Sequence, residues 1–281
     1  MLDIEYVMMN PAQNLTGLVI TPVPKEQHLN ISNFLLQPAY IGAEQIGFVS
    51  FLKQNAIVRL DMPNNEFCGD GTLATAVLAS WMNVVDTSQF LVEVSGVEEP
   101  LLASVEPISS HEFYAKVEMP RHFRQRSYEL PLGEECFSGT LIELPGISHF
   151  IIHSDDVNGS KEMIISLVKQ LSVQHKAPAY GVITYEVHEN NIQMIPCIYI
   201  PKSGKLMFES ACGSGTMALG IFLSSINVSR VQTDIVQPGG ILDVDVIPSD
   251  SSTENNFAIE RLSLGGRVKI SSKGHAYLAE C

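Results

Sequence analysis

The sequence CGDGTLA at residues 68–74 recurs as CGSGTMA at residues 212–218, at an offset of 144 in a chain of 281 residues. Two further matches lie at the same offset: Leu91-Val92 with Ile235-Val236, and Gly96 with Gly240. Three matches in one register indicate an internal repeat whose period is close to half the chain. We therefore expect two similar half-proteins, each with one copy of the cysteine motif.

Each copy of the motif has the same neighbours along the chain. An apolar, strand-like run precedes it, a helical pattern follows it, and then come a strand that ends in a glycine turn and a further strand. In the two halves these are residues 56–60 and 197–200 for the first strand, 72–81 and 216–223 for the helix, and 90–96 and 234–240 for the second strand and its turn. The motif should therefore lie at the N-terminus of a helix in both halves.

The rest of the chain is mostly typical of short β-strands. One more helix is expected at residues 161–171, capped by Ser160, and the polar residues 120–128 are the best candidate for a linker. The expected strands are residues 4–9, 17–21, 46–51, 113–119, 181–187, 257–262 and 268–271. This pattern predicts two α+β domains, each a curved sheet around one central helix.

Composition and charge exclude several classes of protein. The chain is 45% hydrophobic and 17% charged, which is typical of a globular protein, and its net charge is −14. Such a charge repels nucleic acids and anionic lipid surfaces, so neither is an expected partner. No apolar run approaches the length of a membrane span, and the acidic start of the chain does not resemble a secretory signal. We expect a cytoplasmic protein.

The five cysteines form no recognisable structural framework. Their number is odd and no CxxC pair occurs, so a disulfide framework and a zinc ribbon are both disfavoured. Cys136, Cys197 and Cys281 have no special context, and we interpret them as structural or incidental. This leaves Cys68 and Cys212 as the cysteines with a chemical context.

A thiol just before a helix is favoured as the thiolate by the helix dipole and by unsatisfied backbone N–H groups. The neighbouring glycines let such N–H groups approach a carboxylate. Two facing motifs could therefore hold a small carboxylate between Cys68 and Cys212, one removing a proton from carbon while the other delivers one to the opposite face. The N–H groups would stabilise the carbanion, so no cofactor is required.

Other interpretations of the motifs stay open. Each copy also fits the dinucleotide pattern G-x-G-x-x-A, although parallel βαβ units are not evident around it. The cysteines could be small apolar residues at helix starts, or a redox pair. His149 and His153 share one face of a strand-like run, but no third ligand stands at a recognisable spacing, and we expect no metal site.

The paired motifs resemble those of the cofactor-independent, two-cysteine racemases and epimerases of the diaminopimelate epimerase and proline racemase superfamily. The resemblance covers nearly the whole chain and includes residues 10–14 (NPAQN), 148–150 (SHF) and 237–240 (QPGG). Within the superfamily the chain is most similar to the histidine racemases, including those of the opine-metallophore type. Their counterparts here are residues 44–48, 65–69, 199–201 and 209–215.

The resemblance implies a fold and an assembly. The fold would be two pseudo-symmetric α+β domains, each a curved, mostly antiparallel sheet or barrel around a central helix, with the active site in the cleft between them. The domains would span residues 1–124, joined by the C-terminal strand 272–281, and residues 125–271. A homodimer that needs no pyridoxal phosphate is also implied.

Departures from neighbouring branches bear on the substrate. Residues 205–211 (KLMFESA) lack the arginine that holds the second carboxylate of diaminopimelate in its epimerases, so that substrate is disfavoured. The phenazine-biosynthesis-like isomerases share a glutamate near Glu44 but lack a second cysteine, which makes Cys212 the distinguishing residue. Asp70 stands where the epimerases have asparagine and the isomerases histidine, and its role is open.

The resulting prediction is a racemase that interconverts L-histidine and D-histidine, with Cys68 and Cys212 as the acid/base pair. The alternatives are another amino-acid racemase or epimerase, and a phenazine-biosynthesis-like isomerase that uses Glu44. Glu44 and Glu209 could also be solvated carboxylates at strand ends. The residues expected to bind the substrate are Asn14, Glu44, Gln45, Asn65, Gly69, Asp70, Glu209, Gly213 and Ser214.

Overall fold

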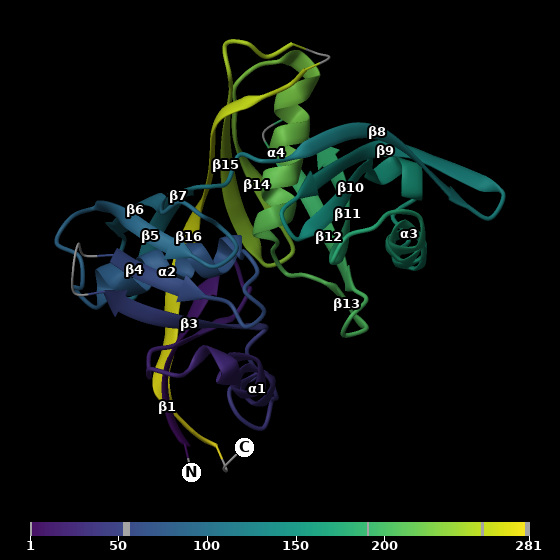
Figure 1. The fold of residues 1–281 in the computed structure, drawn as a ribbon. Helices are drawn as coiled ribbons and strands as arrows, with labels where there is room; N and C mark the ends of the chain where they lie inside the picture. Colours follow the sequence, from purple (N-terminus) through teal and green to yellow (C-terminus); the bar gives the residue numbers. More distant parts are fainter. Residues whose placement is uncertain (1, 53–56, 190, 254–255, 279–281) are drawn as a thin grey trace. The chain divides into compact units, whose positions relative to one another are not determined.

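The computed structural model describes residues 2–52, 57–189, 191–253 and 256–278 (Figure 1). The chain forms two compact units, Met1–Pro120 with Gly265–Cys281, and Arg121–Leu264. We expected boundaries at residues 124/125 and 271/272, and both lie earlier in the chain. Each expected boundary falls inside a strand, since β8 begins at Arg124 and β16 runs unbroken from Ile259 to Leu278. The first division lies instead in the loop before β8, after Pro120, and the second lies within β16, before Gly265.

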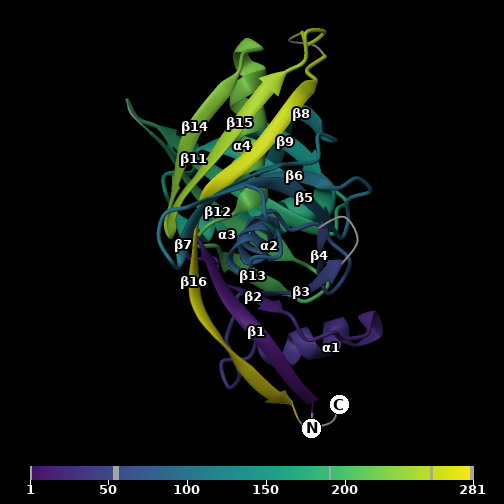
Figure 2. The same cartoon turned by 90° about the vertical axis from the view of Figure 1, so that its left-hand side faces the viewer.

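The first unit is a closed barrel around a helix. Its strands follow the order β1-β2-β3-β4-β5-β6-β7-β16, and pairing of β1 with β16, seen side by side in Figure 2, closes eight strands into a ring. Helix α2 (Gly69–Trp81) packs against seven of these strands, and its residues from Gly69 to Ala79 are all buried. The strands and the outer helix are β1 (Leu2–Pro11), β2 (Thr16–Val19), α1 (Lys25–Leu35), β3 (Gln45–Leu52), β4 (Ile57–Asp61), β5 (Gln89–Val94), β6 (Leu101–Pro107) and β7 (Glu112–Glu118).

The second unit repeats the plan around helix α4 (Gly213–Asn227). The strand order is β16-β15-β14-β12-β11-β10-β9-β8, with β13 paired to β12. Helix α4 packs on β15, β14, β11, β10 and β9, whereas α3 (Lys161–Gln174) covers β8, β11 and β12. The remaining elements are β8 (Arg124–Leu132), β9 (Glu135–Leu144), β10 (Ile147–His153), η1 (Ser154–Val157), β11 (Ala179–Val187), β12 (Ile192–Ile200), β13 (Lys205–Phe208), β14 (Val231–Gln237), β15 (Gly240–Pro248) and β16 (Ile259–Leu278).

The predicted α+β class, with mostly antiparallel strands around one central helix per unit, is confirmed. One supporting statement is wrong: parallel βαβ units do surround the motifs. Strands β4 and β5, which flank α2, are parallel neighbours, and so are β12 and β14, which flank α4. The crossover places each helix against the inner face of its sheet and brings the motif to the helix start.

Several element boundaries differ from the prediction. Both central helices begin one turn earlier than expected, at Gly69 and Gly213. The sequence places their starts too late, because the first turn is rich in glycine, which is a weak helix former. Helix α1 and the β8–β9 hairpin were not expected, and both are rich in polar residues. The two strands expected at residues 257–262 and 268–271 are one strand, since the glycines between them, Gly265 and Gly266, do not interrupt the pairing.

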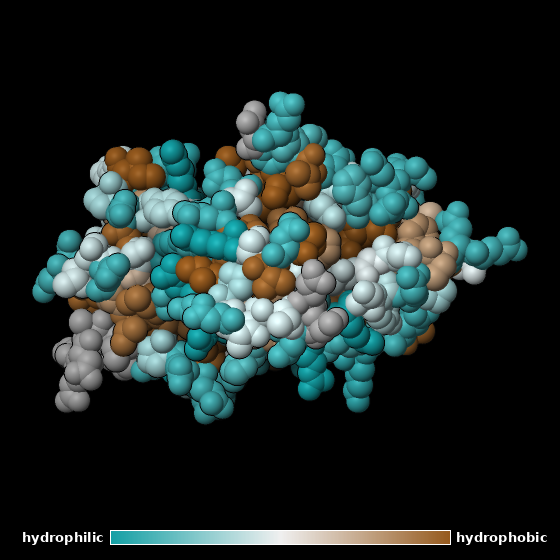
Figure 3. Space-filling view, turned by 90° about the horizontal axis from the view of Figure 1, so that it is seen from above, coloured by the Kyte–Doolittle hydropathy of each residue, from teal (hydrophilic) through white to brown (hydrophobic). Residues whose placement is uncertain are grey.

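Apolar residues are scattered among polar ones on the face shown in Figure 3. Single apolar side chains such as Ile241, 50% exposed, and Ile195, 44% exposed, reach the surface of the second unit. Among the residues that the structure describes, no helix is both long and apolar enough to cross a membrane.

Candidate active site

The two motif cysteines occupy the same local position in their units. Cys68 is the N-cap of α2 and Cys212 is the N-cap of α4, both in extended conformation. Each Sγ accepts a hydrogen bond from the backbone N–H three residues later, Gly71 and Gly215, over the same distance of 3.3 Å. A sulfur that accepts from a helix N-terminus is favoured in its anionic form. The predicted chemical context of these two thiols is therefore present in both units.

The motif glycines make this contact sterically possible. A Cβ atom on Gly71 would lie 3.3 Å from the Cys68 Sγ, and one on Gly215 would lie 2.8 Å from Ile183 Cδ1 and 3.3 Å from the Cys212 Sγ. Any side chain at either position would therefore press on the sulfur that the N–H group binds. Glycine is therefore required at both positions, because the backbone approaches the cysteine sulfur closely.

The motif threonines hold the cysteine backbone. The hydroxyl of Thr72 donates to the Cys68 carbonyl oxygen at 2.6 Å, and Thr216 donates to the Cys212 carbonyl at 2.8 Å. Both threonines are fully buried. Their recurrence in both copies of the repeat is the sequence signal for this role.

In the first unit, three of the predicted substrate-binding residues lie together at the Cys68 motif. The Cys68 thiol donates to Gln45 Oε1 at 3.0 Å, and Gln45 Nε2 donates to Thr16 Oγ1 at 2.8 Å. Asn14, buried in the turn after β1, donates from Nδ2 to Asp70 Oδ2 at 3.1 Å. The role of Asp70, which the sequence left open, includes this bond between the motif and the asparagine loop.

Glu44 and Asn65 lie on loops of the same unit. Glu44 precedes β3, is half-buried, and its backbone N–H donates to the Leu15 carbonyl. Asn65 is exposed and has a φ of 61°, so it shapes the turn before the motif. That turn packs on Gly96, where a Cβ would lie 2.7 Å from the Phe67 nitrogen. This contact, together with a φ of 77°, accounts for the glycine at position 96.

In the second unit, a buried glutamine holds the motif. The Cys212 N–H donates to Gln237 Oε1 at 2.8 Å, and Gln237 Nε2 donates to Thr216 Oγ1 at 2.9 Å. The Gly239 N–H donates to the Ser210 carbonyl at 2.7 Å. The late glycine turn therefore positions the backbone of the second cysteine, and Gln237, which the sequence does not predict as a site residue, lies beside it. No local pattern in the sequence connects it with Cys212.

The Cys212 side chain is linked to a buried histidine through a serine hydroxyl. Its Sγ lies 3.4 Å from Ser214 Oγ, and Ser214 Oγ lies 2.9 Å from His149 Nε2. His149 is fully buried on β10, and desolvation lowers its pKa to about 3, so the imidazole is neutral at ordinary pH. Sequence spacing had paired His149 with His153, but His153 instead lies 3.5 Å from Asp155 Oδ2.

Glu209 and Cys197 lie near each other before α4. The Glu209 N–H donates to the Pro196 carbonyl at 3.1 Å. Burial and the nearby Glu209 charge raise the pKa of Cys197 to about 11, so its thiol stays protonated. A buried, protonated thiol agrees with the structural interpretation of Cys197. Within the described part of the chain, no group of three histidine, cysteine or acidic side chains is arranged to hold a metal ion.

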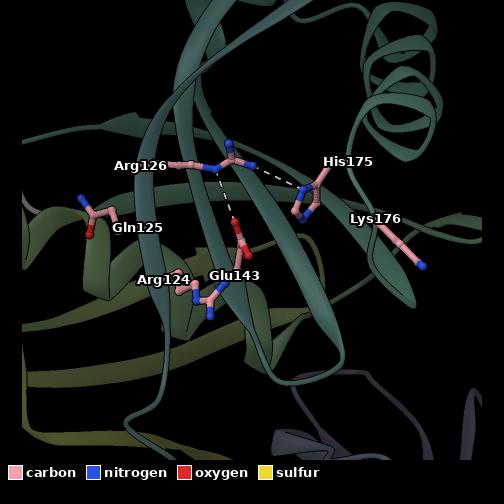
Figure 4. A pocket seen from close by; sticks show the side chains of 6 residues that line it. All are labelled: Arg124, Gln125, Arg126, Glu143, His175 and Lys176. Carbon is pink, nitrogen blue, oxygen red and sulfur yellow. Dashed lines mark hydrogen bonds and ion pairs between the residues drawn. The ribbon is translucent and has the colours of Figure 1, made fainter.

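A separate hollow of about 690 Å³ lies on the second unit, between the β8–β9 hairpin and the end of α3 (Figure 4). Arg126 points there toward both Glu143 and His175, with atoms 3.4 Å apart in each case, and its guanidinium lies over the Tyr128 ring. Arg126, Glu143 and His175 therefore form polar contacts with one another. The hollow is lined by Arg124, Gln125, Arg126, Glu143, His175 and Lys176, and neither cysteine motif contributes to it. The hollow is therefore not the candidate site.

The close packing of His149 gives a first testable prediction. Its strand neighbour is Gly181, and a Cβ at Gly181 would overlap the His149 ring at Nδ1. We expect Gly181→Ala to displace the ring and to lower the free energy of unfolding by about 1–3 kcal/mol, as overpacking does. Urea titration followed by circular dichroism measures this change. Gly274→Ala is the control, because its nearest neighbour lies at 3.3 Å, and equal stability of the two variants would contradict the prediction.

Comparison with known proteins gives a consistent result. A family model described as the histidine racemase CntK N-terminal domain matches residues 3–277. The histidine racemase of Staphylococcus aureus is 25% identical over 279 residues, covering 98% of this chain and 98% of the relative. That of Fusobacterium nucleatum is 28% identical over 283 residues, covering 99% and 97%.

The solved structures show the same fold. A probable proline racemase from Agrobacterium radiobacter, crystallised with bound carbonate, superposes with a TM-score of 0.75 at 11% identity, covering 98% of this chain and 93% of that one. At this identity the likeness concerns the fold alone.

Proposed function

We propose, since this chain belongs to the histidine racemase family, that it interconverts L-histidine and D-histidine by moving the α-proton between Cys68 and Cys212. Racemisation as the class of reaction follows from the family. The observation that supports the two cysteines is their matching geometry: each Sγ caps a central helix and accepts the glycine N–H at 3.3 Å. One thiolate would take the proton from one face of the α-carbon, and the other thiol would supply a proton to the opposite face.

The helix starts would bind the α-carboxylate. Gly69 and Asp70 begin α2, and Gly213 and Ser214 begin α4. The first N–H groups of a helix have no partner within the helix and favour an anion. As the α-proton leaves, negative charge spreads onto the carboxylate, and these N–H groups would stabilise it without an electron-accepting cofactor.

The polar residues around Cys68 would bind the rest of the substrate. Asn14 and Gln45 are already held in place by Asp70 and Thr16, so little order is lost when they bind a ligand. Glu44, Glu209 and Asn65 complete the proposed set, and carboxylates suit an ammonium or imidazole group better than a second acid. This supports histidine over diaminopimelate.

Proton exchange in D₂O tests the function directly. The purified protein, without added cofactor, is incubated with each amino acid, and loss of the α-proton signal is followed by NMR together with the appearance of the other enantiomer. We expect exchange and inversion with histidine. Exchange with other amino acids but not histidine would favour the broader racemase. Absence of exchange with every amino acid would overturn the proposed reaction and leave the isomerase that uses Glu44.

We also propose that the enzyme works as a homodimer in the cytoplasm. A reducing compartment would keep the two proposed catalytic thiols free, and Cys68, Cys136, Cys197 and Cys212 are all unbridged. The dimer is implied by the superfamily resemblance, and light scattering after gel filtration tests it. A mass of 30.8 kDa in solution would show a monomer instead.

A further inference from the structure

The two capping cysteines differ in the polar atom that each side chain meets. Cys68 Sγ is 3.0 Å from an amide oxygen, Gln45 Oε1, whereas Cys212 Sγ is 3.4 Å from a hydroxyl, Ser214 Oγ. The capping bonds are alike, so the side-chain neighbour is a difference between the two cysteines. An amide oxygen can only accept a hydrogen bond, but a hydroxyl can either donate or accept. The neighbours therefore favour different protonation states.

The orientation of the Gln45 amide is determined by its other neighbours. Thr16 Oγ1 donates its own hydrogen to the Asn14 carbonyl at 3.2 Å, so it must accept from Gln45. Gln45 therefore directs Nε2 toward Thr16, at 2.8 Å, and Oε1 toward Cys68. A thiolate facing that oxygen would be repelled, whereas a thiol can donate to it. This arrangement favours Cys68 as the neutral thiol.

The buried His149 determines what Ser214 offers to Cys212. The imidazole is neutral, because desolvation lowers its pKa to about 3, so only one of its nitrogens carries a hydrogen. Nδ1 is buried over Gly181 and has no hydrogen-bond partner among the described residues. An orphaned buried N–H is rarer in proteins than an orphaned acceptor. The hydrogen therefore belongs on Nε2, which donates to Ser214 Oγ at 2.9 Å.

This tautomer leaves the Ser214 hydroxyl hydrogen free to donate to the Cys212 sulfur, which favours the thiolate. The first turns of the two helices differ in the same direction. Asp70 adds a carboxylate to the first turn of α2, whereas the first turn of α4 has no acidic residue. Each unit also has one of the two predicted glutamates, Glu44 and Glu209, so these do not distinguish the cysteines. Negative charge in the first turn disfavours a second negative charge on Cys68.

We propose that the resting protein carries Cys212 as the thiolate and Cys68 as the thiol, and that His149 is a positioning residue that maintains this state through Ser214. On the proposed function, on which the catalytic consequence rests, Cys212 removes the first α-proton and Cys68 supplies the replacement. The proton leaves carbon for the Cys212 sulfur while the Cys68 S–H bond breaks, so the enzyme ends the half-cycle with the two states exchanged. The resting enzyme is then selective for the enantiomer whose α-proton faces Cys212.

Alkylation with iodoacetamide across a pH series tests the resting state without any substrate. Peptide mass spectrometry reports the rate at each cysteine separately, and the pH midpoint of each rate profile is compared, because absolute rates also depend on access to the half-buried Cys68 and the buried Cys212. We expect the Cys212 midpoint to lie at least about one pH unit below that of Cys68. Equal midpoints, or a lower one at Cys68, would overturn the proposal.

Variants separate the positioning role from a merely structural one. Ser214→Ala and His149→Leu should both raise the Cys212 midpoint by about one pH unit, whereas His149→Gln, which can place a donor nitrogen near Ser214, should largely restore it. Ser225→Ala, on the same helix with its hydroxyl on the Phe222 carbonyl, is the matched control and should leave the midpoint unchanged. If His149→Leu fails to fold, Ser214→Ala still tests the proposal. An unchanged pH midpoint of Cys212 alkylation in Ser214→Ala contradicts it.

The outcome is independent of racemase activity. A separation of midpoints in a protein that racemises no amino acid would support the resting state and refute the proposed function. Active racemisation of histidine with equal alkylation midpoints would support the proposed function and refute the proposed resting state.

Discussion

Replacing either capping cysteine is expected to abolish racemisation. In Cys68→Ala and Cys212→Ala, one of the two groups that exchange protons with the α-carbon is missing, and a positioned acid or base contributes typically 10²- to 10⁴-fold to a rate. The loss should reach at least that size in both variants, because inversion needs a group on each face. Polarimetry or chiral chromatography of histidine in either direction measures it.

The remaining cysteines provide the matched control. Cys136 is exposed, and its thiol donates to Glu129 on the neighbouring strand, away from both motifs. Cys136→Ala should therefore keep full activity and the same circular dichroism spectrum as the wild type. Full turnover in either capping-cysteine variant, with the fold intact, would contradict the two-thiol mechanism.

The same variants distinguish the rival isomerase. An enzyme that relies on Glu44 as its acid/base group would lose activity in Glu44→Gln and retain it in Cys212→Ala. The two-thiol mechanism predicts the opposite ranking, with the larger loss in Cys212→Ala.

Local patterns in the sequence were sufficient for the motif and its flanking elements. The repeat, the glycines and the apolar run before each copy predict a strand, a turn and a helix, and the structure has all three around Cys68 and Cys212. The capping geometry depends on residues within four positions of each cysteine, as the bonds from Gly71 and Thr72 show. Contacts of that range can be predicted from a short stretch of sequence.

Contacts between distant segments could not be predicted in this way. Gln237 meets the Cys212 backbone 25 residues away in sequence, and His149 meets Ser214 at a separation of 65. Both contacts exist because strands from elsewhere in the sheet pack against the start of α4. Sequence spacing instead grouped His149 with His153, since residues four apart share a strand face, but the nearer partner came from another element. Contacts of this kind depend on the order of the strands in the sheet, which local sequence patterns do not give.

Acidification is expected to destabilise the protein through His149. Above the ordinary histidine pKa of 6.5, the ring is neutral in both the folded and the unfolded chain and contributes nothing to the pH dependence. Below that pH the unfolded chain binds a proton that the folded chain excludes until about pH 3. The free energy of unfolding should therefore fall by roughly 1 kcal/mol for each pH unit below 6.5.

The variant His149→Gln isolates this contribution, because it removes the titrating group and leaves every carboxylate in place. The difference in unfolding free energy between wild type and His149→Gln should be constant above pH 7 and should shift against the wild type by roughly 2 kcal/mol between pH 6.5 and 4.5, measured by urea titration. His153→Gln on the same strand is the control, since His153 has a side chain 38% exposed beside Asp155. A difference in unfolding free energy that did not change between pH 6.5 and 4.5 would mean that the buried ring accepts a proton in the folded state. The assignment of His149 as a neutral imidazole that donates to Ser214 would then be wrong.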